Sequence, residues 1–277
     1  MTVKTSLICG EAVTLDDVVD HESIDLIVTQ APAFGEMEGN YDKYSKYMCK
    51  VFLSCFNVLK DGSVFALVVP PHMDRFGKRE NVASWLAMEL EIAGFTFMDH
   101  IKVKNNEYTQ PRSTTFKKTK GQPRTYSANV ITKDVYLYSK RSLRSIPGKQ
   151  EWTKFIYKKP VSKSINTLDE YTEISEPKSA SRTEYYQDWL LTDVWEVNDS
   201  LTRLLIQLFS YDGEVVFDPF ATNSDVSKQA QMLGRNVVGL AEGRAGIKML
   251  QKTLAYGMPS LLATDEERIF ETIDEEG

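Results

Sequence analysis

Apolar positions along the chain fall into short runs that alternate with segments of helical periodicity. Four segments are predicted to be strands from their apolar residues and closing turn residues: 6–9, 24–28, 63–69 and 95–103. Two segments, 41–59 and 81–93, place apolar side chains at helical spacing. This alternation predicts an α/β fold, in which helices cover both faces of a mostly parallel sheet.

A strand-loop-helix-strand unit near the C-terminus is the most informative stretch. The apolar run 215–217 is closed by Asp218-Pro219, a pair that does not continue a strand. Residues 224–234 follow with helical spacing and a glycine at the stop, and 236–240 is a second apolar run. Such a unit predicts parallel strands with a loop at their carboxyl end, where open α/β sheets hold their ligands.

The same unit resembles a motif of the β-group DNA amino-methyltransferases, the N4-cytosine and N6-adenine enzymes, written DPF-AGSGTT followed by LGR-x-x-x-G-I-E. The matching residues are Asp218, Pro219, Phe220, Ala221, Leu233, Gly234, Arg235 and Gly239. The resemblance implies a Rossmann-like methyltransferase fold and a site for S-adenosylmethionine. On this resemblance the cofactor-binding positions are Glu11, Asp218, Pro219, Phe220, Ala221, Thr222, Ser224, Ala241 and Glu242.

These cofactor positions depart from the family in their chemistry. Thr222 and Ser224 replace two glycines, and a Cβ intrudes where the backbone must approach a ligand. Ala241 stands where the family has the acid that would hold the ribose hydroxyls, although Glu242 is next to it. We therefore expect a vestigial site and no bound cofactor, with S-adenosylmethionine as the cofactor if the chain is active.

A second phrase of the same family, G-D followed by V-D-L-I-V-T-[DNS]-P-P-Y, is matched by Gly10-Glu11, residues 24–29 and Pro32. The resemblance places the catalytic positions at Gln30, Ala31, Pro32, Ala33 and Phe34. In the family this motif stacks on a flipped-out base and polarises its amine with a hydrogen-bond acceptor.

Gln30 retains a carbonyl acceptor on a side chain one methylene longer than that of Asn. An error of about 1 Å in such a contact costs on the order of a hundredfold in rate. Ala33 has no ring, and Phe34 reaches the base only if the backbone shifts by one residue. Two interpretations remain open: a vestigial turn, and a divergent active site that uses Gln30 and Phe34.

Charge is distributed unevenly along a chain whose net charge is −6. Residues 102–163 carry sixteen Lys and Arg against three acids, which predicts a basic face on an acidic body. The predicted DNA-binding residues are Lys104, Arg112, Lys117, Lys118, Lys120, Arg124 and Tyr126. Cations interleaved with a stacking ring favour contact with a nucleic-acid backbone. The alternative is a solvated lysine-rich loop.

Domain boundaries follow from these changes in composition. Residues 1–103 and 183–264 are predicted to form the methyltransferase-like core, and 104–182 a basic insertion that resembles a target-recognition region with a linker. Residues 265–277 form an acidic tail, which we expect to be solvated and frayed.

Composition excludes several other classes. The chain has 42% hydrophobic and 26% charged residues, as is typical of soluble globular proteins. No apolar run reaches the ~18 residues of a membrane span, and no signal peptide is visible, so we expect a cytoplasmic protein. Three cysteines and three histidines show no metal-ligand spacing, so we expect free thiols and no metal site.

These departures together predict a DNA methyltransferase-like protein that is catalytically inactive, a pseudoenzyme. We expect it to bind DNA, or to act as a non-catalytic or regulatory subunit beside an active methyltransferase or through self-association. The first alternative is an active, divergent N4-cytosine or N6-adenine DNA methyltransferase. The second is a protein-binding module on a recruited methyltransferase fold.

Overall fold

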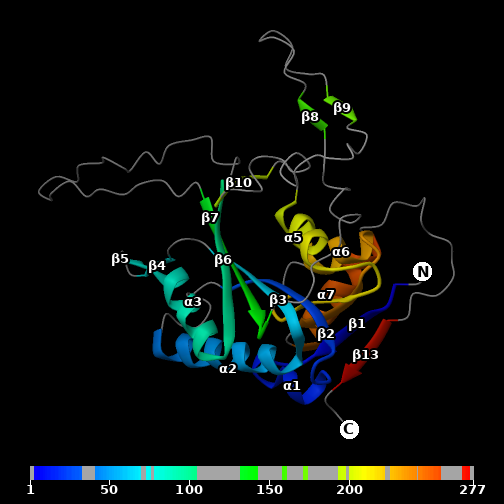
Figure 1. Cartoon of the computed structure of the whole chain (residues 1–277). Coiled ribbons are helices and arrows are strands. Elements are labelled where there is room, and N and C mark those ends of the chain that lie inside the picture. Colours follow the sequence, from blue (N-terminus) through cyan, green and yellow to red (C-terminus); the bar gives the residue numbers. More distant parts are fainter. Residues whose placement is uncertain are drawn as a thin grey trace, which may run out of the picture.

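One nine-stranded sheet forms the centre of the protein (Figure 1). The computed structural model describes residues 3–32, 41–69, 73–75, 78–104, 132–142, 158–160, 171–173, 193–197, 200–221, 225–241, 243–256 and 270–274. The strands of this sheet are β1 (Thr5–Cys9), β2 (Ile24–Gln30), β3 (Leu59–Val69), β6 (Phe95–Lys104), β7 (Thr132–Lys140), β10 (Val194–Glu196), β11 (Val215–Asp218), β12 (Asn236–Ala241) and β13 (Phe270–Asp274). Two short hairpins, β4 (Met73–Arg75) with β5 (Lys78–Glu80) and β8 (Lys158–Pro160) with β9 (Tyr171–Glu173), lie outside it.

The strand order is β10-β6-β7-β3-β2-β11-β12-β1-β13. Neighbouring strands are parallel except in the two pairs that β7 makes, with β3 and with β6. The predicted fold class, a mostly parallel sheet with helices on both faces, is therefore confirmed.

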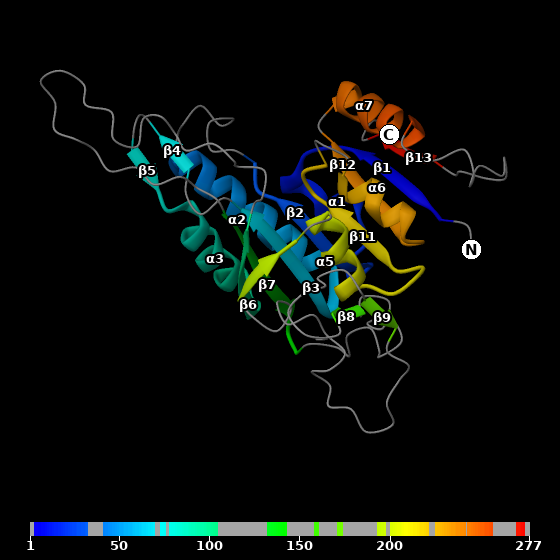
Figure 2. The ribbon, with the colours of Figure 1, turned by 90° about the horizontal axis from the view of Figure 1, so that it is seen from above.

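Helices cover the two faces of the sheet in separate groups (Figure 2). The helices are the 3-10 turn η1 (Ala12–Thr14), α1 (Leu15–Val18), α2 (Tyr41–Val58), α3 (Val82–Ile92), α5 (Leu201–Phe209), α6 (Asp225–Met232) and α7 (Gly243–Tyr256). One core cluster joins α1, α2 and α3 to the sheet. A second cluster joins α5 and α6 to it, and a third joins α7. Ile27 belongs to the first cluster, whereas Leu26 and Val28 belong to the second. This alternation explains why the strand is apolar throughout. None of the helices in the described part of the chain is long and apolar enough to cross a membrane.

Strand β3 begins earlier than the sequence predicts. Its pairing with β2 starts at Ile24 and Leu59, and the register shifts before it resumes at Leu26 and Val64. This irregularity accommodates Gly62, whose φ of 75° lies in the left-handed region. Residues 60–62, which the sequence leaves between the predicted helix 41–59 and the predicted strand 63–69, are therefore part of the strand.

Two predicted boundaries need correction. Strand β7 lies between β3 and β6 in the central sheet, although its residues fall within the predicted insertion 104–182. The tail 265–277 was expected to be frayed, but it contributes β13, which pairs in parallel with β1 along the sheet edge. Strand β13 pairs with β1 from the other end of the chain, so local patterns carry little information about it, whereas β7 is a nine-residue strand that the predicted boundary at residue 104 leaves out of the core.

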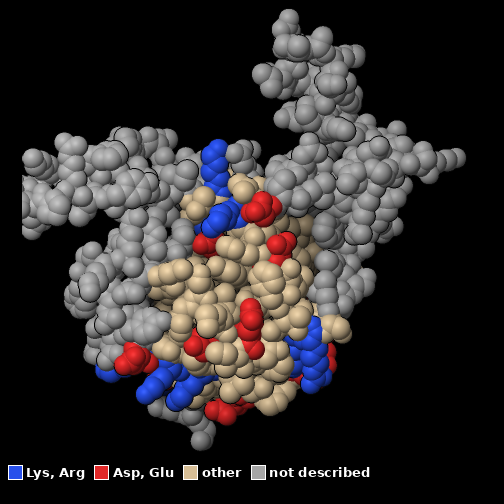
Figure 3. Space-filling view, turned by 60° about the vertical axis from the view of Figure 1, so that its left-hand side comes forward, with Lys and Arg blue, Asp and Glu red and all other residues tan. Residues whose placement is uncertain are grey.

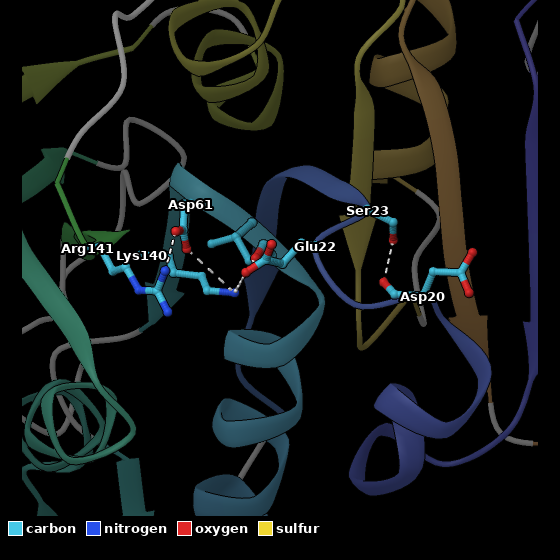
Figure 4. Close-up of polar contacts among 7 residues, drawn as sticks. Asp20, Glu22, Ser23, Asp61, Lys140 and Arg141 are labelled. Atoms are coloured by element: carbon cyan, nitrogen blue, oxygen red, sulfur yellow. Dashed lines mark hydrogen bonds and ion pairs between the residues drawn. The ribbon is translucent and has the colours of Figure 1, made fainter.

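A buried lysine connects β7 to the amino end of β3 (Figure 4). Lys140 is 3% exposed, and its Nζ donates to the Leu59 carbonyl at 2.7 Å. The same ammonium lies 3.3 Å from a carboxylate oxygen of Glu22 and 3.9 Å from one of Asp61, which also pairs with Arg141. A buried cation is tolerated here because carbonyl and carboxylate oxygens replace the lost water.

Candidate functional site

The direction of chain progression reverses between β2 and β11, which are neighbours in the sheet. From β2 the chain passes through α2 to β3 on one side, and from β11 it passes through α6 to β12 on the other. Ligands of open α/β sheets bind in the crevice outside the carboxyl ends of strands at such a point. The two phrases that the sequence singles out both end there, at Gln30 and at Asp218.

A buried hydrogen bond joins the ends of these two strands. The Thr29 hydroxyl donates to Oδ1 of Asp218 at 2.7 Å, and the Phe220 backbone N–H donates to the same oxygen at 3.0 Å. Burial raises the pKa of Asp218 from 3.8 to about 6, while the two hydrogen bonds lower it and nearby Asp225 raises it. The carboxylate therefore fixes the turn after β11 and holds the end of β2 against it.

Gln30 is the last residue of β2, and its side chain is exposed at the carboxyl edge of the sheet. The next residue, Ala31, is buried and its N–H donates to the Val68 carbonyl at 3.4 Å. The Pro32 carbonyl accepts a hydrogen bond from the Tyr44 hydroxyl of α2 at 3.1 Å. The first three of the predicted catalytic positions therefore lie against β3 and α2, and among these three Gln30 has the exposed side chain, which ends in an amide. Ala33 and Phe34 lie outside the described residues.

The turn after β11 packs against α2. The Phe220 ring lies 6.3 Å from the Tyr47 ring, measured between centroids. Ala221 is buried, and its N–H donates to the Leu240 carbonyl of β12 at 3.3 Å. Pro219 lies in the same turn, whereas Thr222 and Ser224 lie outside the described residues. The glycine replacements in the loop therefore remain a sequence-based prediction.

The carboxyl end of β12 lacks an acceptor side chain at the predicted ribose position. Ala241 packs against the aliphatic cluster of α7, and a Cβ built on Gly246 of that helix would lie 3.1 Å from the Ala241 methyl. Its carbonyl accepts the Gly10 N–H at 3.3 Å, which brings the exposed Glu11 to the same edge. Ala241 therefore offers no side-chain acceptor at the position that the family motif gives to the ribose hydroxyls. Glu242 lies outside the described residues.

A charged cluster that sequence reasoning missed lies where β6 and β7 approach the predicted insertion. Asp134 is buried, and its Oδ1 lies 2.9 Å from the Lys102 ammonium and 3.0 Å from Nε2 of His100. The His100 ring stacks on Tyr136, with centroids 4.2 Å apart and an angle of 6° between planes. His100 and Lys102 alternate along β6, so the sequence alone indicates that both lie on one face of the strand. Their shared partner, Asp134, could not be predicted because it depends on the register of β7.

Lys104, the last residue of β6, is the predicted DNA-binding residue that the structure places, and its side chain is exposed beside this cluster. The other six predicted DNA-binding residues lie outside the described residues: Arg112, Lys117, Lys118, Lys120, Arg124 and Tyr126. Within the described ranges, no group of three or more His, Cys, Asp or Glu side chains is placed to hold a metal ion.

Comparison with solved structures gives the same architecture. A protein of Thermus thermophilus, provisionally named a DNA modification methylase and solved with S-adenosyl-L-methionine, shares 16% identity over 98% of this chain and 99% of its own, with a TM-score of 0.64. The PvuII cytosine-N4-specific DNA methyltransferase shares 14% identity over 93% of this chain and 95% of its own, with a TM-score of 0.57. The M1.HpyAVI complex with S-adenosylmethionine shares 14% identity over 90% of this chain and 98% of its own, with a TM-score of 0.52. These similarities establish the fold.

Sequence comparison establishes the family. A search of curated proteins gives no match. The family model for DNA methylases of the N6 and N4 type matches residues 24–252, which include both motifs apart from Gly10-Glu11 and the whole of the switch point. The chain therefore belongs to the N6/N4 DNA methylase family.

Proposed function

We propose that this protein is a DNA-binding, non-catalytic member of the DNA methylase family, a subunit that engages DNA without transferring a methyl group. The proposal rests first on Ala241. Amino-methyl transfer needs S-adenosylmethionine held in a fixed position, and binding its ribose requires hydrogen-bond acceptors at the carboxyl end of the sheet. Ala241 offers a methyl group that packs against α7 instead.

The arrangement around Gln30 supports the same proposal. Ala31 and Pro32 are fixed by hydrogen bonds to β3 and α2, so the strand end cannot slide easily to bring a different residue to the edge. The acceptor in this position is a flexible amide on a longer stem, without the preorganisation that transition-state stabilisation requires. Each departure alone would cost rate, and both act on the same reaction step.

DNA is the proposed ligand because the named structural relatives are DNA methyltransferases and because cations gather at one corner of the sheet. Lys102 and Lys104 of β6 and Lys133 of β7 are exposed where these strands lead into residues 105–131. Phosphate contacts of this kind do not depend on the chemistry applied to a base. Binding that is weak, sequence-independent and salt-sensitive follows from such contacts.

Transfer of a labelled methyl group from S-adenosylmethionine to duplex DNA tests the proposal. We expect no incorporation above the level seen without protein. Incorporation that disappears in Gln30→Ala would overturn the proposal and support a divergent active N4-cytosine or N6-adenine methyltransferase that uses this amide as its acceptor.

A further inference from the structure

Helix α3 stops short of one end of the sheet that it covers. The Tyr138 hydroxyl of β7 donates to the Ala87 carbonyl of α3 at 2.9 Å. Two residues earlier in β7, the Tyr136 side chain hydrogen-bonds that of Ser84. The next residue of β7 on this face, Asp134, lies ~7 Å further along the strand, a distance that takes about five helical residues. Helix α3 begins only two residues before Ser84, so it does not reach this row of the sheet.

A β-bulge in β6 directs polar side chains onto the same face. The register between β6 and β7 shifts between Phe97 and Asp99. After the shift, His100 lies opposite Tyr136, and Lys102 follows two residues later on the same face. Without the extra residue, strand alternation would place His100 and Lys102 on the other face of the sheet. Bulges of this kind re-aim side chains and are common beside functional sites.

The His100 ring is backed by a second ring and is partly exposed. It stacks on Tyr136, with centroids 4.2 Å apart and 6° between the planes. The His100 side chain is nevertheless 33% exposed. Because Tyr136 covers one face of the ring, this exposure lies on the opposite face and the edge. A supported aromatic ring on a sheet surface is the kind of platform on which proteins stack unpaired bases.

A cation and an apolar side chain lie next to this ring. Lys102 lies between Asp134 of β7 and Val194 of β10 in the strand register. Its ammonium is 2.9 Å from the buried Asp134 carboxylate, and its side chain is 48% exposed. An ammonium has three donors, so this contact leaves capacity for a phosphate oxygen. Val194 is 44% exposed and adds apolar surface beside the cation. We refer to His100, Lys102 and Val194 as the strand-end patch.

The charge along β6 suits a chain of phosphates. Lys104 is the next residue of β6 on this face and is also exposed. Residues two apart in a strand are separated by ~7 Å, which is comparable with the distance between consecutive phosphates of an extended single strand. Figure 3 shows the side of the molecule that carries α3 and β6, with basic side chains at its upper end, a few acidic ones beside them and a largely uncharged centre.

We propose that the strand-end patch binds an unpaired nucleotide of single-stranded DNA, with the base stacked on His100 and the phosphate on Lys102. The bases of a duplex are already stacked on one another and paired, so a duplex offers no base to this ring. The patch therefore gives the protein a preference for single-stranded over duplex DNA. This inference rests on the proposed function, because it takes DNA as the ligand and names the form of DNA that is bound.

Fluorescence anisotropy with a labelled oligo-dT of about 12 nucleotides and a labelled duplex of the same length tests the inference at ~50 mM salt. We expect the full chain to bind the single strand at least about fivefold more tightly. His100→Gln keeps a hydrogen-bond donor for Asp134 but removes the ring. It should weaken single-strand binding about tenfold and change duplex binding by less than about twofold.

Two further variants separate stacking from other effects. His100→Phe keeps a ring and removes the donor to Asp134, so it should retain single-strand affinity within about twofold of the wild type. His21→Ala is the matched control, since His21 is exposed before β2, away from the patch, and should change neither affinity. Circular dichroism of each variant verifies that it is folded.

The possible outcomes separate this inference from the proposed function. Equal affinity of the wild type for both forms of DNA would overturn the inference and leave the proposed function in place. The same holds if His100→Gln binds the single strand as tightly as the wild type, or if His100→Phe loses as much affinity as His100→Gln. Absence of binding to either form would overturn the proposed DNA-binding function, and this inference with it.

Discussion

The Thr29 hydroxyl donates a 2.7 Å hydrogen bond to Asp218, a residue 189 positions away in sequence, and so joins the ends of β2 and β11. Thr29 directly precedes Gln30, where the family motif has its base acceptor, and Asp218 begins the turn that leads to residues 222–224, where the motif has its glycine loop. The bond is buried, so its partners cannot exchange it for water at low cost. The frame of the switch point is therefore intact even though Gln30 and Ala241 depart from the family.

Removing this bond should destabilise the fold. In Thr29→Val, Oδ1 of Asp218 keeps the hydrogen bond from the Phe220 N–H and loses the one from the hydroxyl. We expect a loss of about 1–3 kcal/mol in the free energy of unfolding at neutral pH, because a buried acceptor loses its donor. Urea denaturation gives this value. Thr29→Ser keeps the hydroxyl and serves as the control. A Thr29→Val variant as stable as the wild-type chain would contradict the assigned role of this hydrogen bond.

Asp218 should also make the free energy of unfolding depend on pH. Its pKa is about 6 in the folded chain against an ordinary value of 3.8, so the folded state binds more protons between these values. The stability that this group contributes is thus present below about pH 4 and is lost as pH rises through about 6. Asp218→Asn removes the titration.

Comparison of the two chains isolates this effect from other titrating groups. The unfolding free energy of Asp218→Asn relative to wild type should increase by about 2–3 kcal/mol between pH 4 and pH 7. Urea unfolding at intervals of pH provides both curves. A constant difference between them across this range would contradict the assigned role of the carboxyl group.

Lys140 offers a test of the opposite end of the sheet. Lys140→Ala removes a buried donor to the Leu59 carbonyl and leaves a cavity beside Phe56, whose ring lies 5.0 Å from the ammonium. We expect a loss of about 2–4 kcal/mol in the free energy of unfolding. Lys140→Met keeps most of the stem and should lose less than half as much. Equal losses in the two variants, which both lack the ammonium, would show in thermal or urea unfolding that the charge, and not packing, dominates.

DNA binding should depend steeply on salt. Neutralising Lys117, Lys118 and Lys120 together should flatten the slope of log K against log salt by up to about 0.9 for each phosphate that the variant no longer neutralises. Neutralising Lys248 and Lys252, which are exposed on α7, is the matched control and should leave the slope unchanged. Fluorescence anisotropy with a labelled duplex measures both. Absence of binding at ~50 mM salt, or an unchanged slope in the triple variant, would remove DNA from the account.

Much of the core could be predicted from the sequence because its signals are local. The apolar run of β11 and its Asp-Pro stop, and the periodicity of α2, identify a strand and a helix within a few residues of their observed ends. Strand β13 was missed because Phe270 and Ile273 stand among acids and pair with β1, far away in the chain. Tertiary pairing supplies the stability that its own sequence lacks.

In the candidate site too, some residues could be predicted from the local sequence, whereas their contacts could not. Asp218, Phe220 and Ala241 could be found from the order of residues in two phrases, but the Thr29 bond and the packing of Ala241 on α7 depend on strand register. The pairing of Asp134 with His100 and Lys102 likewise requires β6 and β7 to be aligned. Residue identity locates candidate chemistry, and the sheet decides which side chains meet.

Titration calorimetry of the full chain with S-adenosylmethionine tests the central claim most directly, because every catalytic interpretation needs that cofactor. We predict no saturable heat up to ~1 mM ligand, since Ala241 provides no acceptor for the ribose. A saturable isotherm with a Kd in the low micromolar range would contradict the account and establish a working cofactor site.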